Sequence, residues 1–512
     1  MTGGPVPPAR PRSIVVLGGG TAGWMAAMLF QHRWGASGTR VTLIESKDIG
    51  IIGVGEGSTP QLKNFFDTLS IAEAQWMPRC NATYKTGIAF ADWSDEPGYE
   101  TYFHPFQTAI DSFTAPGFFH NTQARRGGHA VEARPDPFFI PARLAAERKA
   151  PVAPSTFPFF TSYGYHFDAY LVGDFLREQA SARGVERIET TIASVEIDSD
   201  GMVAALIDSA GLRIEAELFI DASGFRAAII EGALSEPHIP FAENLFNDRA
   251  VVMPTPVPPE GPEVATRATA LSAGWAWHIP LTNRSGNGYV YSSRFINPDA
   301  AEAELRAHIG TGPEVEARHL TMRVGRVERS WVGNCLAIGL AQGFVEPLEA
   351  TALHVVMATV DKFIATVDRD GADETVRVGF NAAIARRIDG IRDYIVCHYR
   401  AARRRDTDYW RAATQHDELS DSLKSIFTTW FRGGDLEREV IRQGINDIYS
   451  PLSWHCLLGG YGNYPAVVPI QPTSPALIDM AEVERFVAGC AANFPAHRDA
   501  LDALVASPPA RS

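Results

Sequence analysis

Residues 13–24, SIVVLGGGTAGW, constrain the fold of this chain more than any other stretch. Residues 13–17 are mainly apolar and rich in β-branched side chains, which is typical of a buried strand in a parallel sheet. The glycine motif G-x-G-x-x-G follows at residues 18–23, and an apolar segment that we expect to be helical starts at Trp24. Glycines in such a turn let the backbone approach a pyrophosphate, whose charge the helix N-terminus attracts. The stretch therefore predicts a dinucleotide site.

A second predicted strand supports this site. It covers residues 40–44 and is followed by Glu45, 22 residues after Gly23, where an acid can accept hydrogen bonds from ribose hydroxyls. A tight turn with a surface glutamate is the alternative interpretation, and the motif alone does not distinguish NAD from FAD. The candidate cofactor-binding residues of this region are Gly18, Gly20, Thr21, Ala22, Gly23 and Glu45.

The composition argues against several classes of protein. The 512 residues are 45% hydrophobic and 21% charged, which is ordinary for a soluble globular protein. The net charge of −14 argues against a nucleic acid or an anionic membrane as the main partner. The five cysteines are scattered without metal-ligand spacing, so we expect no metal site and a reducing, cytoplasmic setting. No apolar run is long enough to span a bilayer, and the Pro/Gly-rich residues 1–12 predict a flexible arm rather than a secretory signal.

Two stretches near the first motif are candidates for the same site. Residues 50–60, GIIGVGEGSTP, alternate glycine with apolar side chains, so Gly53 and Val54 are candidates for a strap over the cofactor; a packed Ω-loop is the alternative. Lys85 lies inside an apolar segment at 81–93 that we expect to be a strand after Tyr84. An inward lysine is costly unless it is paired or used, although an edge or snorkelling position is more common.

The middle of the chain predicts mixed structure. Residues 105–161 are dense in Phe, Pro, His and Gly, and we expect an irregular segment that covers a pocket. A helix is expected over 166–184, with Asp168 near its N-cap and Gly184 as its stop. A hairpin should follow over 185–207, and then a strand over 212–220 that ends in Asp221, a second place where a ribityl or phosphate group could approach.

The second half contains two unusual motifs. Trp275 and Trp277 are two residues apart, so a strand would place both rings on one face, where ordinary core packing is the simplest interpretation. A strand at 335–338 and a glycine turn then lead to a helix that we expect to open at 346–349. The backbone N–H groups of Thr351 and Ala352 could face an anion there, whereas Glu349 alone would be only a first-turn helix acid.

The remaining segments predict helices. Residues 355–410 and 417–443 are expected to be helical, with the RAARRR run at 400–405 on a solvated face. Residues 454–462, WHCLLGGYG, are expected to end in a turn.

Taken together, the motifs resemble the flavin-dependent halogenases, the family that includes the tryptophan halogenases. The most specific marker is W-x-W-x-I-P, present as WAWHIP at residues 275–280. Three further markers agree: GGGTAGW at 18–24, CNATYK ending at Lys85, and GFVEPLEAT ending at Thr351. The similarity extends from about residue 14 to about residue 465.

The resemblance implies an α/β fold. Residues 13–400 would form a Rossmann-like FAD-binding core of the flavin-monooxygenase type, with inserted segments that cap the substrate. Residues 401–512 would form a helical region that completes the substrate pocket, and residues 1–12 the flexible arm. A homodimer is compatible with the resemblance.

The resemblance also implies a reaction. Reduced FAD, O₂ and a halide form hypohalous acid, which reaches an aromatic substrate in a separate pocket. A separate flavin reductase would supply the reduced FAD, since no second nucleotide fingerprint is evident. Carried over to this sequence, the family's roles fall on catalytic Lys85 and Glu349, on Leu340, Trp275 and Trp277 beside FAD, on Thr351 and Ala352 for the halide, and on His104, Phe106 and Trp454 for the substrate.

Departures from the family pattern bear on specificity. Ala350 and Ala352 stand where the family often has Ser and Gly, so we expect a different pocket shape and leave the choice between chloride and bromide open. We favour bromide slightly because it is easier to oxidise. Tryptophan-specific members have a tyrosine pair and an acid that hold the amino-acid backbone. The comparable stretch from Tyr449 to Tyr461 has Ser450, Ser453, Trp454 and His455 and no such pair, so we expect an indole or another electron-rich aromatic instead of free tryptophan. A flavin-dependent aromatic hydroxylase and a non-catalytic FAD-binding protein remain the alternatives.

Overall fold

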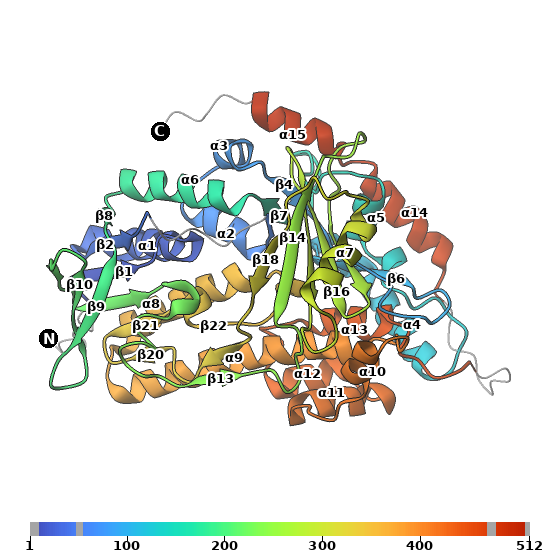
Figure 1. Cartoon of the computed structure of the whole chain (residues 1–512). Helices are drawn as coiled ribbons and strands as arrows, with labels where there is room; N and C mark the ends of the chain where they lie inside the picture. The colour runs from blue at the N-terminus through green and yellow to red at the C-terminus, as the bar shows by residue number, and fades with distance from the viewer. Residues whose placement is uncertain (1–9, 48–54, 468–477, 507–512) are drawn as a thin grey trace, which may run out of the picture.

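A computed structural model describes residues 10–47, 55–467 and 478–506 (Figure 1). The predicted Gly53 and Val54 lie outside these ranges. Two large sheets and the helices packed on them organise the chain, which confirms the predicted α/β class. In Figure 1 the six-stranded sheet lies at the left with α1 (Thr21–Trp34) and α6 (Ala169–Ala182), and the seven-stranded sheet stands to its right.

The six-stranded sheet is centred on the strand predicted at 13–17. Its order is β20-β21-β12-β1-β2-β8, and all neighbouring pairs are parallel except β20 with β21. The strands are β1 (Ser13–Leu17), β2 (Arg40–Glu45), β8 (Glu186–Glu189), β12 (Leu218–Asp221), β20 (Trp331–Val332) and β21 (Cys335–Ala337). Helix α1 (Thr21–Trp34) follows β1 directly and starts three residues before the expected Trp24, so the strand, glycine turn and helix are confirmed.

The seven-stranded sheet carries the WAWHIP motif. Its order is β18-β14-β17-β16-β15-β5-β6, antiparallel except for the parallel pair of β15 and β5. Its strands are β5 (Gly87–Ala91), β6 (Thr101–Pro105), β14 (Arg249–Thr255), β15 (Thr266–Leu271), β16 (Gly274–Pro280), β17 (Ser285–Tyr291) and β18 (Arg318–Thr321). Helix α7 (Pro298–Ile309) packs against β14 and β17.

Three smaller sheets correct two predictions. They contain β3 (Glu56–Gly57), β7 (Gly164–Phe167) and β4 (Thr83–Lys85); β11 (Arg213–Ile214), β10 (Val203–Asp208) and β9 (Ile192–Ile197); and β13 (His238–Pro240), β19 (Gly325–Val327) and β22 (Gly343–Phe344). The single strand expected after Tyr84 is wrong, because β4 pairs with β7 whereas β5 pairs in the large sheet. The strand expected over 212–220 is likewise divided between β11 and β12, which belong to different sheets.

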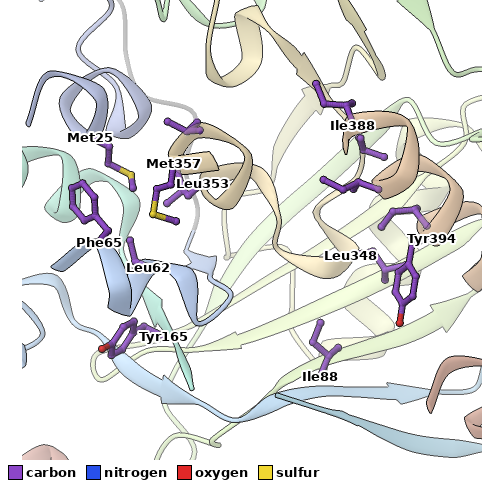
Figure 2. Close-up of a cluster of buried hydrophobic side chains, with 14 of the residues drawn as sticks. Met25, Leu62, Phe65, Ile88, Tyr165, Leu348, Leu353, Met357, Ile388 and Tyr394 are labelled. Carbon is purple, nitrogen blue, oxygen red and sulfur yellow. The ribbon is translucent and has the colours of Figure 1, made fainter. Parts of the chain in front are cut away.

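Long helices join the two large sheets through one hydrophobic core. Helix α8 (Ala352–Asp370) packs against α1, α2 (Gln61–Thr68) and α9 (Glu374–Ala401). Helix α8 ends at Gly371, and the Asp373 carboxylate caps α9 by accepting a hydrogen bond from the Val376 N–H, so the helical run expected over 355–410 is interrupted. Figure 2 shows side chains of α1, α2 and α8 at one end of this core and side chains of α9 at the other.

The remaining helices correct two further expectations. They are α3 (Glu73–Trp76), α4 (Ala115–Arg126), α5 (Ile140–Ala146), α6 (Ala169–Ala182), α10 (Asp408–Gln415), α11 (Asp421–Phe431), α12 (Leu436–Gln443), α13 (Pro451–Gly460), α14 (Met480–Ala491) and α15 (His497–Ala506). The segment 105–161 contains α4 and α5, because its phenylalanines form small cores with α13 and α14. Residues 454–460 are helical, because Ser450 caps α13 and Pro451 opens it, and the turn expected at the end of 454–462 follows at 461–462. Residues 402–405 lie beyond the end of α9, where Arg404 donates to the Ala270 carbonyl.

Two features of the described residues limit the kinds of site available. No described helix is both long and apolar enough to cross a membrane. Within the described ranges, no three His, Cys, Asp or Glu side chains gather in a way that could hold a metal ion.

Candidate active site

A cavity of about 950 Å³ lies between the parallel sheet, strand β16 and the start of α8. We call it the dinucleotide cavity. Most of the residues that sequence reasoning selected line this one cavity: Gly18, Gly20, Thr21, Ala22, Glu45, Lys85, Trp275, Trp277, Leu340, Thr351 and Ala352. Segments more than 300 residues apart in the chain therefore meet at one surface.

The glycines of the first motif have different tasks. Gly18 has φ +122°, and a Cβ there would lie 2.2 Å from the Ala222 carbonyl oxygen. A Cβ on Gly23 would lie 1.9 Å from the Gly18 oxygen, so Gly23 serves the close packing of helix and strand and is not part of the cavity wall. A Cβ on Gly20 would meet nothing within 4 Å, so this backbone stands open to the cavity.

The acid at the end of β2 stands beside this turn. A Cβ on Gly19 would lie 1.9 Å from Glu45 Oε2, and Glu45 Oε1 accepts a hydrogen bond of 2.5 Å from Arg187 Nε. The first turn of α1 contains no acidic residue, so nothing there competes with a bound anion. The open glycine, the helix N-terminus and the flanking acid together fit the diphosphate and ribose of a dinucleotide such as FAD.

Asp221, the second place where the sequence predicted contact with the cofactor, does not line the cavity, whereas the residues after it do. The Asp221 carboxylate is fully buried and accepts hydrogen bonds from Ser223 Oγ at 2.6 Å and from the Ile229 and Ile230 N–H groups at 2.8 Å. These bonds hold residues 222–224, which line the cavity. Asp221 therefore shapes the wall without reaching the space inside it.

The two tryptophans share one face of β16, as predicted. Their ring centroids are 6.1 Å apart, and both rings line the dinucleotide cavity. Gly288 pairs with Trp277 across the strands, and a Cβ there would lie 2.1 Å from the ring, so glycine makes room for the indole. Trp275 Nε1 donates to Glu346 Oε2 at 3.2 Å.

Glu346 is a buried acid that sequence reasoning missed. Its Oε2 also accepts hydrogen bonds from Tyr399 Oη at 2.5 Å and from Asn247 Nδ2 at 3.3 Å, and the residue lines the cavity. Burial raises the pKa of Glu346 to about 7, although the hydrogen bonds from Tyr399, Trp275 and Asn247 act in the opposite direction. Glu346 belongs to the GFVEPLEAT motif, which was a signal in the sequence. The sequence does not distinguish its role from that of Glu349, because both acids stand near the start of the same predicted helix.

Lys85 is the buried cation of the site. It ends β4, its side chain is fully buried, and it lines the dinucleotide cavity. Among the described residues its Nζ has no hydrogen-bond partner, and it lies 5.4 Å from the centre of the Phe106 ring. Burial lowers the pKa of Lys85 to about 7, although the charge of Glu349 opposes this shift. At neutral pH this side chain therefore exists in both protonation states.

Glu349 interacts electrostatically with Lys85. It is buried but does not line the dinucleotide cavity, and its Oε1 is 2.8 Å from His398 Nε2. Burial raises the pKa of Glu349, but the His398 hydrogen bond and the charges of His104, His398 and Lys85 outweigh it, so the net shift is downward. Glu349 therefore stays ionised at neutral pH.

The chain does not enter the long helix where the sequence predicted. Residues Pro347–Glu349 form a short 3₁₀ turn, Ala350 follows with φ +53°, and α8 starts at Ala352. The left-handed Ala350 separates the acid from the helix and is strained for a residue with a Cβ. Thr351 is the N-cap, and both Thr351 and Ala352 line the cavity, so N–H groups of the first turn are available to an anion there.

None of the three predicted substrate residues lines the cavity. Phe106 contacts Lys85, whereas His104 and Trp454 meet at the Tyr394 ring. His104 is buried, and its Nδ1 has no hydrogen-bond partner among the described residues. Burial lowers the pKa of His104 to about 4. The Tyr394 ring lies 6.3 Å from His104 and 4.8 Å from Trp454, and stacks on Tyr449 at 3.6 Å.

Four members of this group were not predicted. Tyr394 and His398 are one turn apart on α9, Tyr449 precedes α13, and Tyr461 follows it. His398 Nδ1 lies 2.8 Å from Tyr461 Oη, and Glu349 raises the pKa of Tyr394, Tyr449 and Tyr461 beyond the effect of burial. We define the aromatic cluster as His104, Tyr394, His398, Tyr449, Trp454 and Tyr461. The i, i+4 pair on α9 was a signal in the sequence, but such spacing is equally typical of a helix core.

Comparison with known proteins agrees with this geometry. The family model described as tryptophan halogenase matches residues 13–473. The tryptophan 6-halogenase SttH of Streptomyces toxytricini is 36% identical over 443 residues, which are 82% of this chain and 84% of that protein. Two solved structures are similar over nearly their whole length. Xcc4156, a flavin-dependent halogenase from Xanthomonas campestris, has 34% identity and a TM-score of 0.83, covering 98% of this chain and 99% of its own. BrvH, a flavin-dependent halogenase from Brevundimonas sp. BAL3, has 33% identity and a TM-score of 0.81, covering 97% and 99%. This chain belongs to the tryptophan halogenase family and is an FAD-dependent halogenase.

Proposed function

We propose that the chain uses reduced FAD, O₂ and bromide or chloride to make hypohalous acid, which Lys85 directs to an electron-rich aromatic such as indole. Bound in the dinucleotide cavity, FAD would supply the oxidation of the halide. The observation that carries the proposal is the position of Lys85. It lines the cavity, faces Phe106, and interacts electrostatically with Glu349.

The residues on the cavity side would bind and confine. Gly18, Gly20, Thr21 and Ala22 would hold the diphosphate, and Glu45 the ribose. Trp275 and Trp277 would fill the space beside FAD, so that the aromatic substrate stays away from it. The N–H groups of Thr351 and Ala352 would hold the halide; because these are backbone donors, the alanines at 350 and 352 do not prevent anion binding.

Lys85 and Glu349 would act as an acid and a base. As the C–X bond forms, the O–X bond of hypohalous acid breaks, and the protonated Lys85 gives its proton to the departing oxygen, which leaves as water. Glu349 takes the proton from the ring carbon, and proton return from Glu349 to Lys85 restores both groups. A pKa near 7 suits this role for Lys85, and the lowered pKa of Glu349 keeps it ready to accept.

The aromatic cluster supports a substrate without an amino-acid headgroup. His104, Phe106 and Trp454 would contact the ring. Among the polar groups near them, His398 is bonded to Glu349 and Tyr461, and Tyr394 donates to the Ser453 carbonyl. Three further polar atoms have no partner among the described residues: His104 Nδ1, Tyr449 Oη and Trp454 Nε1. The cluster as defined contains no lysine or arginine to pair with a carboxylate, which favours a neutral aromatic over a zwitterion.

Partners and setting follow as part of the proposal. A separate flavin reductase would deliver reduced FAD. All five cysteines lie in the described ranges and are free, which suits a reducing cytoplasm. The three segments 1–12, 13–400 and 401–512 remain our proposed domain division, and a homodimer is the assembly that we would test first.

The test is turnover of the purified protein with a flavin reductase, FAD, equal bromide and chloride, and a panel containing indole, phenols and free tryptophan. We expect brominated indole as the main product by mass. Oxygen insertion without halogen would establish the hydroxylase alternative, and no halide-dependent consumption of any aromatic would establish a non-catalytic FAD-binding protein. A clear preference for free tryptophan over indole would overturn the substrate class alone.

A further inference from the structure

A chain of buried hydrogen bonds connects two family motifs to the wall beside Lys85. Thr83 Oγ1 donates to the Pro280 carbonyl at 2.7 Å and lies 3.0 Å from His166 Nδ1. His166 Nε2 lies 2.9 Å from Thr266 Oγ1. Thr83 and Lys85 are two residues apart on β4, and Pro280 is the proline of WAWHIP. The side chains of Thr83, Lys85, His166 and Thr266 are at most 8% exposed.

The protons in this chain can be assigned by counting. The Thr83 hydroxyl proton is used on Pro280, so the bond from His166 must be an Nδ1–H donating to Thr83 Oγ1. Burial lowers the pKa of His166 well below its usual value, and the charge of Lys85 adds to this effect, so the ring is neutral. A neutral ring with Nδ1–H has a lone pair on Nε2, which must accept the Thr266 hydroxyl proton.

Thr266 is thereby made an acceptor toward the cavity. Its hydroxyl proton points to His166, so its oxygen can only accept a hydrogen bond from any further partner. Thr266 and Lys85 both line the dinucleotide cavity. A Cβ built on Gly57 would lie 3.1 Å from Lys85 Nζ and 3.4 Å from Thr266 Oγ1, so both polar atoms border the space that the missing side chain leaves. Lys85 Nζ has no hydrogen-bond partner among the described residues, so the two atoms are not joined directly.

We propose that this space is the binding place of hypohalous acid, which Lys85 and Thr266 hold together. The inference rests on the proposed function. Hypohalous acid has one O–H donor and an oxygen that can accept a hydrogen bond. The cavity wall offers the Lys85 amine as a donor and Thr266 Oγ1 as an acceptor. Lys85 would donate to the oxygen of the acid while Thr266 Oγ1 accepts its O–H, which fixes the direction of the O–X bond. Thr83 and His166 are positioning residues, because they act only by orienting the Thr266 hydroxyl.

The test compares Thr266→Val, Thr266→Ser and Thr269→Val. Valine keeps the volume of threonine and removes the acceptor, serine keeps the acceptor, and Thr269 is a buried threonine on the same strand that does not line the cavity. The measurement is the share of oxidant that halogenates the substrate against the share that escapes and consumes added monochlorodimedone. We expect Thr266→Val to raise escape relative to product by about three- to tenfold, the worth of one hydrogen bond, with the FAD Kd unchanged. Thr266→Ser should recover the wild-type ratio.

A second measurement does not depend on turnover. In the purified full chain labelled with ¹⁵N-histidine, the ring shifts of His166 should show the Nδ1–H tautomer. Thr83→Val should shift this balance toward Nε2–H, turn the Thr266 hydroxyl outward, and raise escape as Thr266→Val does. An Nε2–H ring in the wild type would overturn the assignment, which keeps the inference testable even if Thr266→Val does not fold.

The outcomes separate the two proposals. A wild-type ratio of product to escape in Thr266→Val would overturn this inference and leave the proposed function standing. A wild-type chain that makes neither hypohalous acid nor halogenated product would overturn both. If Thr266→Ser raised escape of the oxidant as much as Thr266→Val does, the Thr266 side chain would act through packing and not as an acceptor.

Discussion

Lys85 lines the dinucleotide cavity and interacts electrostatically with Glu349, which is bonded to His398 of the aromatic cluster. The cavity and the cluster are built in different ways. The cavity wall combines glycine turns and the starts of α1 and α8 with side chains such as Trp275, Trp277 and Lys85, and the cavity measures about 950 Å³. In the cluster, the rings of Tyr449, Trp454 and His104 lie 3.6–6.3 Å from the Tyr394 ring, and His398 is bonded to Tyr461. The first region is suited to a large charged cofactor and the second to a flat neutral ring. Lys85 is the side chain through which a reaction in one region could reach the other.

The largest expected effect comes from removing this connection. Lys85→Met keeps the approximate volume and removes the amine, so we expect product formation to fall by about a thousandfold while oxidation of reduced FAD continues. Both rates can be followed in one reaction, by product mass and by flavin absorbance. Lys63→Met, which removes a lysine paired with Asp67 on α2, is the matched control. Halogenation near the wild-type rate in Lys85→Met would remove Lys85 from the mechanism.

The same variant has an expected effect on stability. Burial lowers the pKa of Lys85 from 10.5 to about 7. Between these two pH values the unfolded chain binds one more proton than the folded chain does, so the free energy of unfolding rises with pH. Below pH 7 the buried amine therefore destabilises the fold, and this loss of stability is recovered as the pH rises toward 10.5. Lys85→Met should therefore raise the free energy of unfolding at pH 7 by about 1–4 kcal/mol. Urea denaturation of the FAD-free protein measures it, and a lower stability would show that lost activity reflects unfolding.

Glu349→Gln tests the substrate side alone. It keeps a bond to His398 but removes the base, so we expect product formation to slow by about a hundredfold with the FAD Kd unchanged. Isothermal titration with FAD and initial rates measure the two effects. Wild-type rates in Glu349→Gln would mean that Glu349 only orders the turn before α8.

Gly20→Val tests the cavity side alone. The backbone of Gly20 is open toward the cavity, so a side chain there would occupy cofactor space and weaken FAD binding by about tenfold. Product formation should recover at saturating FAD, because the aromatic cluster is untouched. Gly379→Ala, at an exposed position of α9 with no neighbour within 4 Å, is the control, and unchanged FAD affinity in Gly20→Val would contradict the placement of the diphosphate.

The smallest expected effect is the pH dependence of the two regions. If protonated Lys85 is the acid, the halogenation rate should fall about fivefold from pH 7 to pH 8, as its protonated share drops from about a half to about a tenth. Glu346 on the cavity side also has a pKa raised to about 7, so the profile is repeated with Glu346→Gln. If the rate still falls between pH 7 and pH 8 in this variant, the fall reflects Lys85. If the fall disappears, it reflects Glu346.

The two regions also differ in how far they could be predicted. The turn at residues 18–23, the acid Glu45 and the shared face of Trp275 and Trp277 follow from local spacing, and the structure confirms their geometry. The start of α8 was misplaced, because the left-handed Ala350 is not a residue type that marks a break. The segment 105–161 was expected to be irregular, because its aromatic residues carry no helical period until α13 and α14 cover them.

Sequence by itself determined the family, the dinucleotide turn and the side chains on which the chemistry is expected to depend, because each is written in a short run of neighbouring residues. Only the tertiary structure decided which of them face the same space. Burial lowers the pKa of Lys85, and Glu349 is bonded to His398, which lies on α9. The contact with His166 directs the Thr266 hydroxyl proton away from the cavity. Burial, pKa and hydrogen-bond direction depend on contacts between residues far apart in the chain, and local spacing carries no record of them.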